Sequence, residues 1–253
     1  MTLPRIVIEP QAEVPVSRLW ATREEWACTA DFAPRRQREY LAWRMIVRRE
    51  IGVWMSEHLA AGGEWLDALR SAEASHSSGV SHSDPALHAE DASLFSDAPS
   101  PERPFPAPLT PQSLAGQIAI DYTEVGAPCL RDIPIYISVS HSADRVAVAF
   151  SAEPCAVDIE SIERNFARVK DHYLTAEEQR LADDPRWLAT AWSAKETLYK
   201  YAGRDALDLV RDLHLGAVDF ASGRIVARIA DAAPVTITFS FRPAEHLVVT
   251  TIL

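Results

Sequence analysis

The nine residues WSAKETLYK, at positions 192–200, place charged and aromatic side chains on one predicted helix. Large apolar residues among them indicate that one side of this helix is buried. Glu196 and Lys200 stand at i and i+4, so they share a face. An exposed pair at this spacing contributes only about 0.3–0.5 kcal/mol, whereas partly buried charges need partners. The segment is therefore either a salt-bridged face beside the core or a face directed at a charged ligand.

A second acidic group lies in CAVDIE, at residues 155–160. Strand alternation places Asp158 and Glu160 on one face and two apolar residues on the other. Two carboxylates on one strand face repel each other unless a cation lies between them. Mg²⁺ prefers oxygen ligands and usually takes one or two carboxylates together with substrate phosphates. Taken alone, the pair is a weak signal for a metal, and two solvated acids on an edge strand are the favoured interpretation; Glu196 would supply a third acid.

A histidine and a basic helix are further candidates for an anion site. His141 lies at the end of a predicted strand, between two serines whose hydroxyls could donate to phosphate. Residues 33–50 contain six arginines and two glutamates, and their apolar positions follow a helical period. The arginine face is either solvated or an anion-binding edge.

Four segments of the chain, in this order, resemble the 4′-phosphopantetheinyl transferase superfamily: ISVSHSADRVAVAFS, CAVDIESIE, YLTAEEQ and WSAKETLYK. The family's patterns are a Ser-His-Ser strand end, a (V/I)-G-(V/I)-D-(I/L)-E strand, an F-(S/T)-x-x-E turn and a W-(S/T/A)-x-K-E-x-x-x-K helix. Order and spacing agree over about residues 117–204, and the basic helix is also similar. The length resembles the monomeric, internally duplicated (Sfp-type) class, not the half-length trimeric class.

The resemblance implies a role for each matching residue. Asp158, Glu160 and Glu196 would bind Mg²⁺ at the pyrophosphate of coenzyme A. Glu196 is also the candidate to accept the proton of an acceptor serine. Lys200 matches the lysine that assists the departing 3′,5′-ADP, and Lys195 would hold phosphate oxygens.

Other positions follow from the same resemblance. Arg35, Arg44 and His141 would hold the 3′-phosphate and diphosphate of coenzyme A. Glu178 matches the acidic position of the turn motif, and we expect it to support the metal site or contact a metal-bound water.

Three positions depart from the family patterns. Ala156 replaces the glycine before the acid pair, and Trp43 replaces a glycine before Arg44. Ala127 stands where a Gly-Lys-Pro turn has its lysine, which removes a cation expected near the 3′-phosphate. Arg131 or the arginine helix could replace it.

The periodicity predicts an α+β fold with two pseudo-symmetric halves, each a small, mainly antiparallel sheet packed with helices. We expect an N-terminal half at 1–140, with a Pro/Ser/Ala-rich insertion at about 71–112, and a C-terminal half at 141–253 that carries the acidic motifs. Predicted helices are 35–60, 64–71 and 175–204, the last with a capping box at Thr175 and Glu178 and a stop at Gly203. Predicted strands are 117–122, 136–142, 145–151, 155–160, 223–230, 235–241 and 246–252.

Composition excludes several classes of protein. The formal net charge of −11 argues against nucleic-acid binding, which needs a basic footprint. No apolar run is long enough to cross a membrane, and the N-terminus has no signal-peptide core. Three cysteines in no C-x-x-C spacing predict neither a disulfide framework nor a zinc site. We therefore expect a cytoplasmic protein, and the family resemblance implies a monomer.

The favoured function is transfer of 4′-phosphopantetheine from coenzyme A to a serine of an acyl or peptidyl carrier protein, with Mg²⁺ as cofactor. One alternative is a module that binds coenzyme A or a carrier protein with weak or no transferase activity. A Mg²⁺-dependent phosphohydrolase would fit the acids but not the combined spacing of the motifs.

Overall fold

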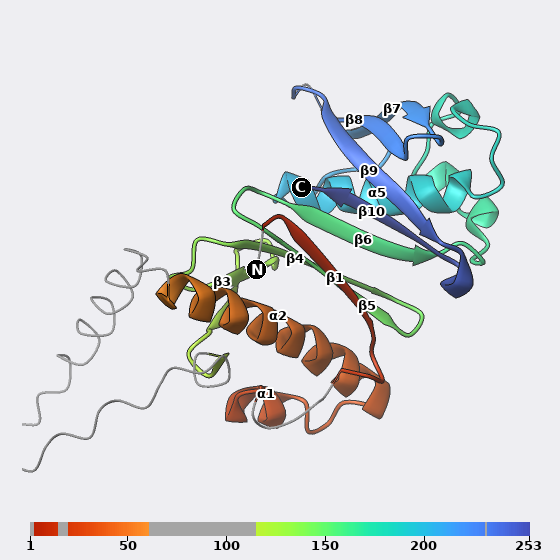
Figure 1. Ribbon diagram of the computed structural model, residues 1–253. Helices are drawn as coiled ribbons and strands as arrows, with labels where there is room; N and C mark the ends of the chain where they lie inside the picture. Colours follow the sequence, from red (N-terminus) through yellow and green to blue (C-terminus); the bar gives the residue numbers. More distant parts are fainter. Residues whose placement is uncertain (1–2, 15–19, 61–114, 231) are drawn as a thin grey trace, which may run out of the picture.

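The computed structural model describes residues 3–14, 20–60, 115–230 and 232–253 (Figure 1). The predicted insertion at 71–112 and the predicted helix at 64–71 lie outside these residues. Among the helices described, none is long and apolar enough to cross a membrane.

The long basic helix is α2 (Pro34–Ala60), which confirms the helix predicted at 35–60. It begins at a proline, whose missing N–H is not needed in the first turn. A short helix that the prediction missed, α1 (Arg23–Cys28), precedes it. Thr22 and Glu25 form a capping box at the start of α1.

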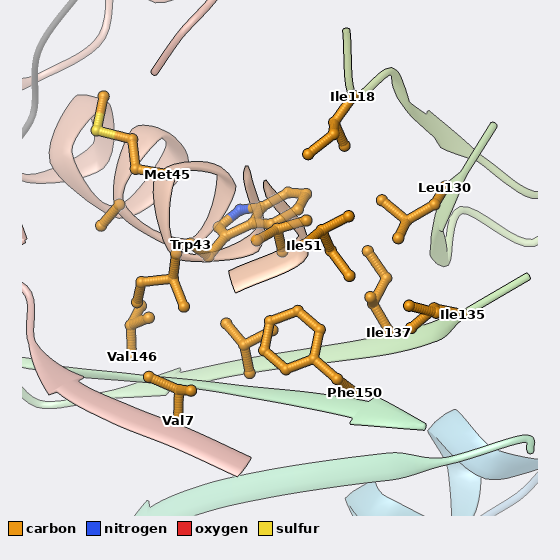
Figure 2. Packing of buried hydrophobic residues seen from close by; sticks show 14 of the residues in the cluster. Val7, Trp43, Met45, Ile51, Ile118, Leu130, Ile135, Ile137, Val146 and Phe150 are labelled. Carbon is orange, nitrogen blue, oxygen red and sulfur yellow. The ribbon is translucent and has the colours of Figure 1, made fainter. Parts of the chain in front are cut away.

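The first sheet has the strand order β1 (Arg5–Pro10), β5 (Arg145–Ser151), β4 (Tyr136–Ser142), and both pairings are antiparallel. Helix α2 packs on one face of it (Figure 1). Figure 2 shows Trp43 and Ile51 of α2 above Phe150 of β5, within one buried apolar cluster. The predicted common face of Val146, Val148 and Phe150 is therefore the core face of the sheet.

The second sheet has five antiparallel strands in the order β6 (Ala156–Ser161), β10 (Leu247–Ile252), β9 (Val235–Arg242), β8 (Arg224–Ile229), β7 (Leu213–Asp219). The three predicted C-terminal strands are confirmed as β8, β9 and β10, and β7 was not predicted. Helix α5 (Trp187–Ala202) covers one face of this sheet (Figure 1). A separate hairpin is formed by β2 (Ile120–Tyr122) and β3 (Pro128–Leu130).

The helix predicted at 175–204 is only partly correct. Thr175 and Glu178 do form the predicted capping box, but a single 3₁₀ turn at Glu178–Arg180 follows it. Helix α5 begins at Trp187, because Pro185 disfavours helical conformation in the residue before it. The predicted stop is confirmed, since Gly203 caps α5 in the left-handed conformation with φ of 59°.

The described part of the chain is a mixed helix and strand structure with antiparallel sheets, as the predicted α+β class requires. The predicted division at residue 140 falls within β4, which pairs with β5 along its whole length. The two sheets separate later, between β5 and β6. The pseudo-symmetry of the two halves stays a prediction.

Candidate functional site

The acid pair lies on β6, the edge strand of the five-stranded sheet, which packs against β4 of the first sheet. Asp158 and Glu160 are buried on one face of the strand. The alternate residues Val157 and Ile159 belong to an apolar cluster that also contains Ala147 of β5. The predicted alternation is confirmed, and the alternative of two solvated acids does not hold.

Asp158 accepts three hydrogen bonds from three directions. Its Oδ1 accepts from the Ser140 hydroxyl at 2.7 Å and from Lys200 Nζ at 2.8 Å. Its Oδ2 accepts from the Ser193 hydroxyl at 2.8 Å. An ionised carboxylate offers about four acceptor positions. One position, on Oδ2, therefore remains open for a further ligand.

Glu160 is held in a similar way. Its Oε1 accepts from the Ser142 hydroxyl at 2.7 Å and from the Ser161 N–H at 2.8 Å. Arg164 donates to its Oε2 and forms an ion pair with it. By the same count, one acceptor position remains, on Oε2.

Serines of β4 join the first sheet to β6. The Ser138 hydroxyl accepts from the Val157 N–H at 3.1 Å, and the Ser140 hydroxyl accepts from the Ile159 N–H at 3.3 Å. These side chains thus stand in for the backbone bonds of a strand ladder. The serine hydroxyls considered above as phosphate donors hold the acids instead. His141 lies between two of them, is exposed, and pairs in register with Val146.

Glu196 on α5 completes the predicted set of three carboxylates. Burial raises its pKa, and the nearby charges of Asp158 and Glu160 raise it further, while Lys200 lowers it. Within the described residues the carboxylate of Glu196 has no hydrogen-bond partner. It is therefore an open, partly desolvated acid beside two acids that are already held.

Lys200, one turn further along α5, connects the acids to a cleft. Its Nζ donates to the Val157 carbonyl at 3.1 Å as well as to Asp158, and its side chain is 28 % exposed. It lines a cleft of about 630 Å³ and an adjoining one of about 260 Å³. The residues that line both clefts come from the turn between β2 and β3, from the start of β3, from β4, from the position before β6 and from the end of α5: Val125, Ala127, Pro128, Ile137, Cys155, Lys200 and Gly203.

Lys195 is not part of this cluster. Its side chain is 0 % exposed, and its Nζ donates to Glu178 at 2.7 Å and to the carbonyls of Leu209 and Leu213. Burial lowers its pKa, and Glu178 opposes that shift. An ammonium group has three donors, and all three are used here. The structure therefore leaves Lys195 no donor for phosphate oxygens.

Glu178, the acid of the turn motif, pairs with Lys195 away from the acid pair. Besides Lys195 and Thr175 it accepts from the Leu215 N–H at 2.7 Å. Its carboxylate thus ties the turn before α5 to β7. The structure gives Glu178 a role in packing and does not place it beside Asp158.

The two candidate arginines of α2 differ in exposure. Arg35 is 76 % exposed and donates to the Ala143 carbonyl at 3.3 Å, next to the strand end that carries His141. Arg44 is 2 % exposed. It forms an ion pair with Glu25 at 3.3 Å and a hydrogen bond with Tyr122. Arg35 thus lies at the surface, where it also forms an ion pair with Glu39 at 2.9 Å, whereas Arg44 is held inside the fold.

Trp43, which replaces a glycine of the family pattern, explains the burial of Arg44. The indole is buried in the core under α2, and the guanidinium of Arg44 lies 4.1 Å from its ring centre. Tyr40 stacks on the same guanidinium at 3.4 Å. This aromatic packing holds Arg44 against the first half of the chain.

The residue types fit a magnesium ion, but the ligands are not gathered in a metal-binding arrangement. Among the described residues, no group of three or more His, Cys, Asp or Glu side chains is arranged to hold a metal ion. Asp158 and Glu160 each keep one open oxygen position, and the Glu196 carboxylate is open. In this structure Lys200 forms an ion pair with Asp158, and Arg164 forms one with Glu160. Oxygen donors of this kind are those that Mg²⁺ prefers.

A scan against family models bears on the part of the chain that holds the acids and α5. Residues 154–249 match the 4′-phosphopantetheinyl transferase superfamily. A search of curated proteins found no match. The matched segment contains Asp158, Glu160, Glu196 and Lys200, and this part of the chain is similar to that superfamily. The basic helix, β4 and the turn at Ala127 precede it.

The structure adds residues that the motifs did not assign. Ser193 binds Asp158 directly, and Thr250 of β10 lies behind it at 2.8 Å. Arg204 lines the smaller cleft, as Ala127 does, is exposed, and has no ion pair or hydrogen bond among the described residues. Helical spacing could have indicated Ser193, because it precedes Thr197, Glu196 and Lys200 on one face of α5.

Proposed function

We propose that the protein transfers the 4′-phosphopantetheine group of coenzyme A to a serine of an acyl or peptidyl carrier protein and releases 3′,5′-ADP. One observation carries the proposal: the charges of Asp158, Glu160 and Lys200 all act on Glu196, and Lys200, paired with Asp158, lines a cleft of about 630 Å³. The superfamily match over residues 154–249 supports it. The monomeric, duplicated class is part of the proposal and rests on length and motif order.

We propose Mg²⁺ as the cofactor, held by Asp158, Glu160 and Glu196. The open oxygen positions on these three side chains support that ligand set, and a cation would offset the burial and the repulsion from Asp158 and Glu160 that raise the pKa of Glu196. When bound, the ion would neutralise charge on the pyrophosphate of coenzyme A.

Residues of this chain would act on the attacking serine and on the departing 3′,5′-ADP. Glu196 accepts the proton of the carrier serine, whose oxygen then forms a bond to the phosphorus that carries the pantetheine arm. The bond between that phosphorus and the oxygen bridging to 3′,5′-ADP breaks. Lys200 places its ammonium group beside the departing phosphate, because its head group already lies between the acids and the cleft.

The 3′-phosphate of coenzyme A needs a cation, since Ala127 supplies none. Arg131 is not free for this role, because it forms a bidentate pair with Asp121 at 2.8 Å and 2.8 Å. Arg204 lines the cleft that Ala127 also lines and has no partner in the part of the chain that is described. We assign the 3′-phosphate to Arg204, with Arg35 and His141 at the other side of the coenzyme.

A protein that binds coenzyme A without transferring its arm is the second candidate. The absence of a cation at Ala127 and the engagement of Lys195 favour it. A binder has no need of Glu196 as a base. The two candidates differ in one result, because only the transferase consumes coenzyme A when an apo carrier is present.

The test uses purified protein, coenzyme A, Mg²⁺ and an apo carrier, followed by intact mass. The wild type should add one phosphopantetheine group to the carrier. Glu196→Gln and Lys200→Ala should lose the addition while their circular dichroism stays that of the wild type. Modification at the wild-type rate by both variants would contradict the assignment.

A further inference from the structure

A chain of three buried hydroxyls ends on Asp158. The Ser193 hydroxyl lies 2.8 Å from Asp158 Oδ2 and 2.8 Å from the Thr250 hydroxyl. The Thr250 hydroxyl lies 2.6 Å from that of Thr197. Ser193, Thr197 and Thr250 are all 0 % exposed. No solvent therefore competes for these bonds.

The direction of the chain follows from the number of protons. Each hydroxyl has one proton to donate. Ser193 uses its proton on Asp158, so Thr250 must donate to Ser193. Thr197 must in turn donate to the Thr250 side chain, with the Thr250 carbonyl at 3.3 Å as its other acceptor. Every donor in the chain thus points toward Asp158.

The backbone sets this chain in place. Thr250 pairs in register with Asp158 across β10 and β6, so their side chains lie on the same face. Ser193 and Thr197 are one helical turn apart on α5, which packs on both strands. These three hydroxyls therefore connect α5 to the five-stranded sheet beside Asp158.

We propose that Thr250, acting through Ser193, is a positioning residue that holds Asp158 with one oxygen position free for a divalent cation. Ser140 and Lys200 occupy Oδ1, and Ser193 occupies one position of Oδ2. Without the Thr250 hydroxyl, Ser193 Oγ no longer accepts a hydrogen bond from β10. The side-chain rotation of Ser193 is then no longer fixed from that side. Thr250 lies one residue past the matched segment and outside every motif. The inference rests on the proposed function for its choice of a cation.

A pair of matched variants on β10 tests it. Thr250→Val and Thr251→Val each remove one buried threonine hydroxyl from the same strand. The Thr251 hydroxyl forms a hydrogen bond with the Thr238 hydroxyl at 2.7 Å and has none with Ser193, Thr197 or Asp158. Free Mn²⁺ is counted by electron paramagnetic resonance during titration of each protein, with and without coenzyme A, and urea unfolding is recorded in parallel.

Thr250→Val should weaken Mn²⁺ binding by about 10-fold, the lower end of the effect found when a residue that supports a metal ligand is lost. Thr251→Val should bind Mn²⁺ as the wild type does. Thr250→Ser keeps the hydroxyl and should restore binding. In turnover, Thr250→Val should raise the Mg²⁺ concentration for half-maximal rate and leave the KM for coenzyme A unchanged.

Several results would overturn the proposal: no Mn²⁺ binding by the wild type, wild-type affinity in Thr250→Val, or an equal loss in Thr251→Val. If Thr250→Val does not fold, Ser193→Ala decides the question by the same titration. Mn²⁺ binding by the wild type without transfer to any carrier would instead contradict the proposed function and leave this inference standing.

Discussion

Two lysines of the same helix, Lys195 and Lys200, should respond in opposite ways to the same substitution. Lys195 is enclosed and uses its three donors on Glu178 and two carbonyls. Removal of one partner of a buried pair typically costs about 3–5 kcal/mol, because the other charge is left without compensation. For a domain of this size, about 2–4 °C of melting temperature corresponds to each kcal/mol, so Lys195→Met should melt about 6–20 °C below the wild type.

Lys200→Met should lower the stability much less than Lys195→Met does. It should lower the transfer activity much more. Its head group is partly solvated, and Asp158 keeps the Ser140 and Ser193 hydroxyls. We expect a loss of about 1.5 kcal/mol, the lower end of the range for a hydrogen bond to a charged group, because the head group of Lys200 is partly solvated. Transfer should fall by orders of magnitude, since this lysine is the cation beside the cleft.

The assay combines urea unfolding, followed by tryptophan fluorescence, with transfer kinetics on the fraction that is folded. Adding Glu178→Gln to Lys195→Met should recover part of the stability, because no unpaired charge then remains. If Lys195→Met unfolds at the wild-type urea midpoint and raises the KM for coenzyme A, the lysine holds phosphate after all and the packing role is refuted.

Three further outcomes follow from the same contacts. Folding raises the pKa of Glu196 above its usual 4.5, so the ionised side chain disfavours the folded state at neutral pH. Glu196→Gln should therefore be more stable than the wild type at pH 7 by about 0.5–2 kcal/mol, and the difference should vanish below pH 4.5, where the carboxyl is protonated in both states; equal midpoints at pH 7 would contradict this. Arg204→Ala should raise the KM for coenzyme A but not for dephospho-coenzyme A, and Ala127→Lys should restore it, with Arg211→Ala, an exposed arginine outside the cleft, as the control. Chelation of divalent metal should abolish transfer in the wild type, and Mg²⁺ should raise the melting temperature of the wild type but not of Glu196→Gln; retention of activity in the chelator would count against the metal.

Strand periodicity was sufficient to place the acid pair. The alternation of Asp158 and Glu160 with two apolar residues holds because successive side chains of a strand point to opposite faces, and Val157 and Ile159 pack in an apolar cluster on the other face. The strand β7 was missed because its pairing with β8 shifts between Leu215 and Val218, which interrupts the alternation. β1 was missed because a single short apolar run between prolines has no local partner.

Helical geometry would have separated the two lysines in advance. Residues five apart on a helix are about 140° apart around its axis, so Lys195 and Lys200 cannot face the same ligand. Glu196 and Lys200 are only about 40° apart and do lie together. Motif similarity placed all three on one site, whereas the angle assigns Lys195 to the other side of α5.

The partners of the acids were beyond prediction, because they come from segments distant in the chain. Ser140 reaches Asp158 only since β4 lies beside β6, and Thr250 does so only since β10 pairs with β6. A serine or threonine has no sequence signal that tells a buried bridge from a solvated hydroxyl. The burial of Arg44 likewise depends on Glu25 and Tyr122, which reach it from α1 and β2.

The intact mass of apo carrier proteins after incubation with the wild-type protein, coenzyme A and Mg²⁺ tests the central claim most directly. A panel of purified carriers from fatty-acid, polyketide and nonribosomal-peptide systems covers the substrate class. The account predicts that at least one carrier gains the mass of a single phosphopantetheine group, with an equal amount of 3′,5′-ADP released. No gain of mass in any carrier, with coenzyme A bound and unconsumed, would contradict it.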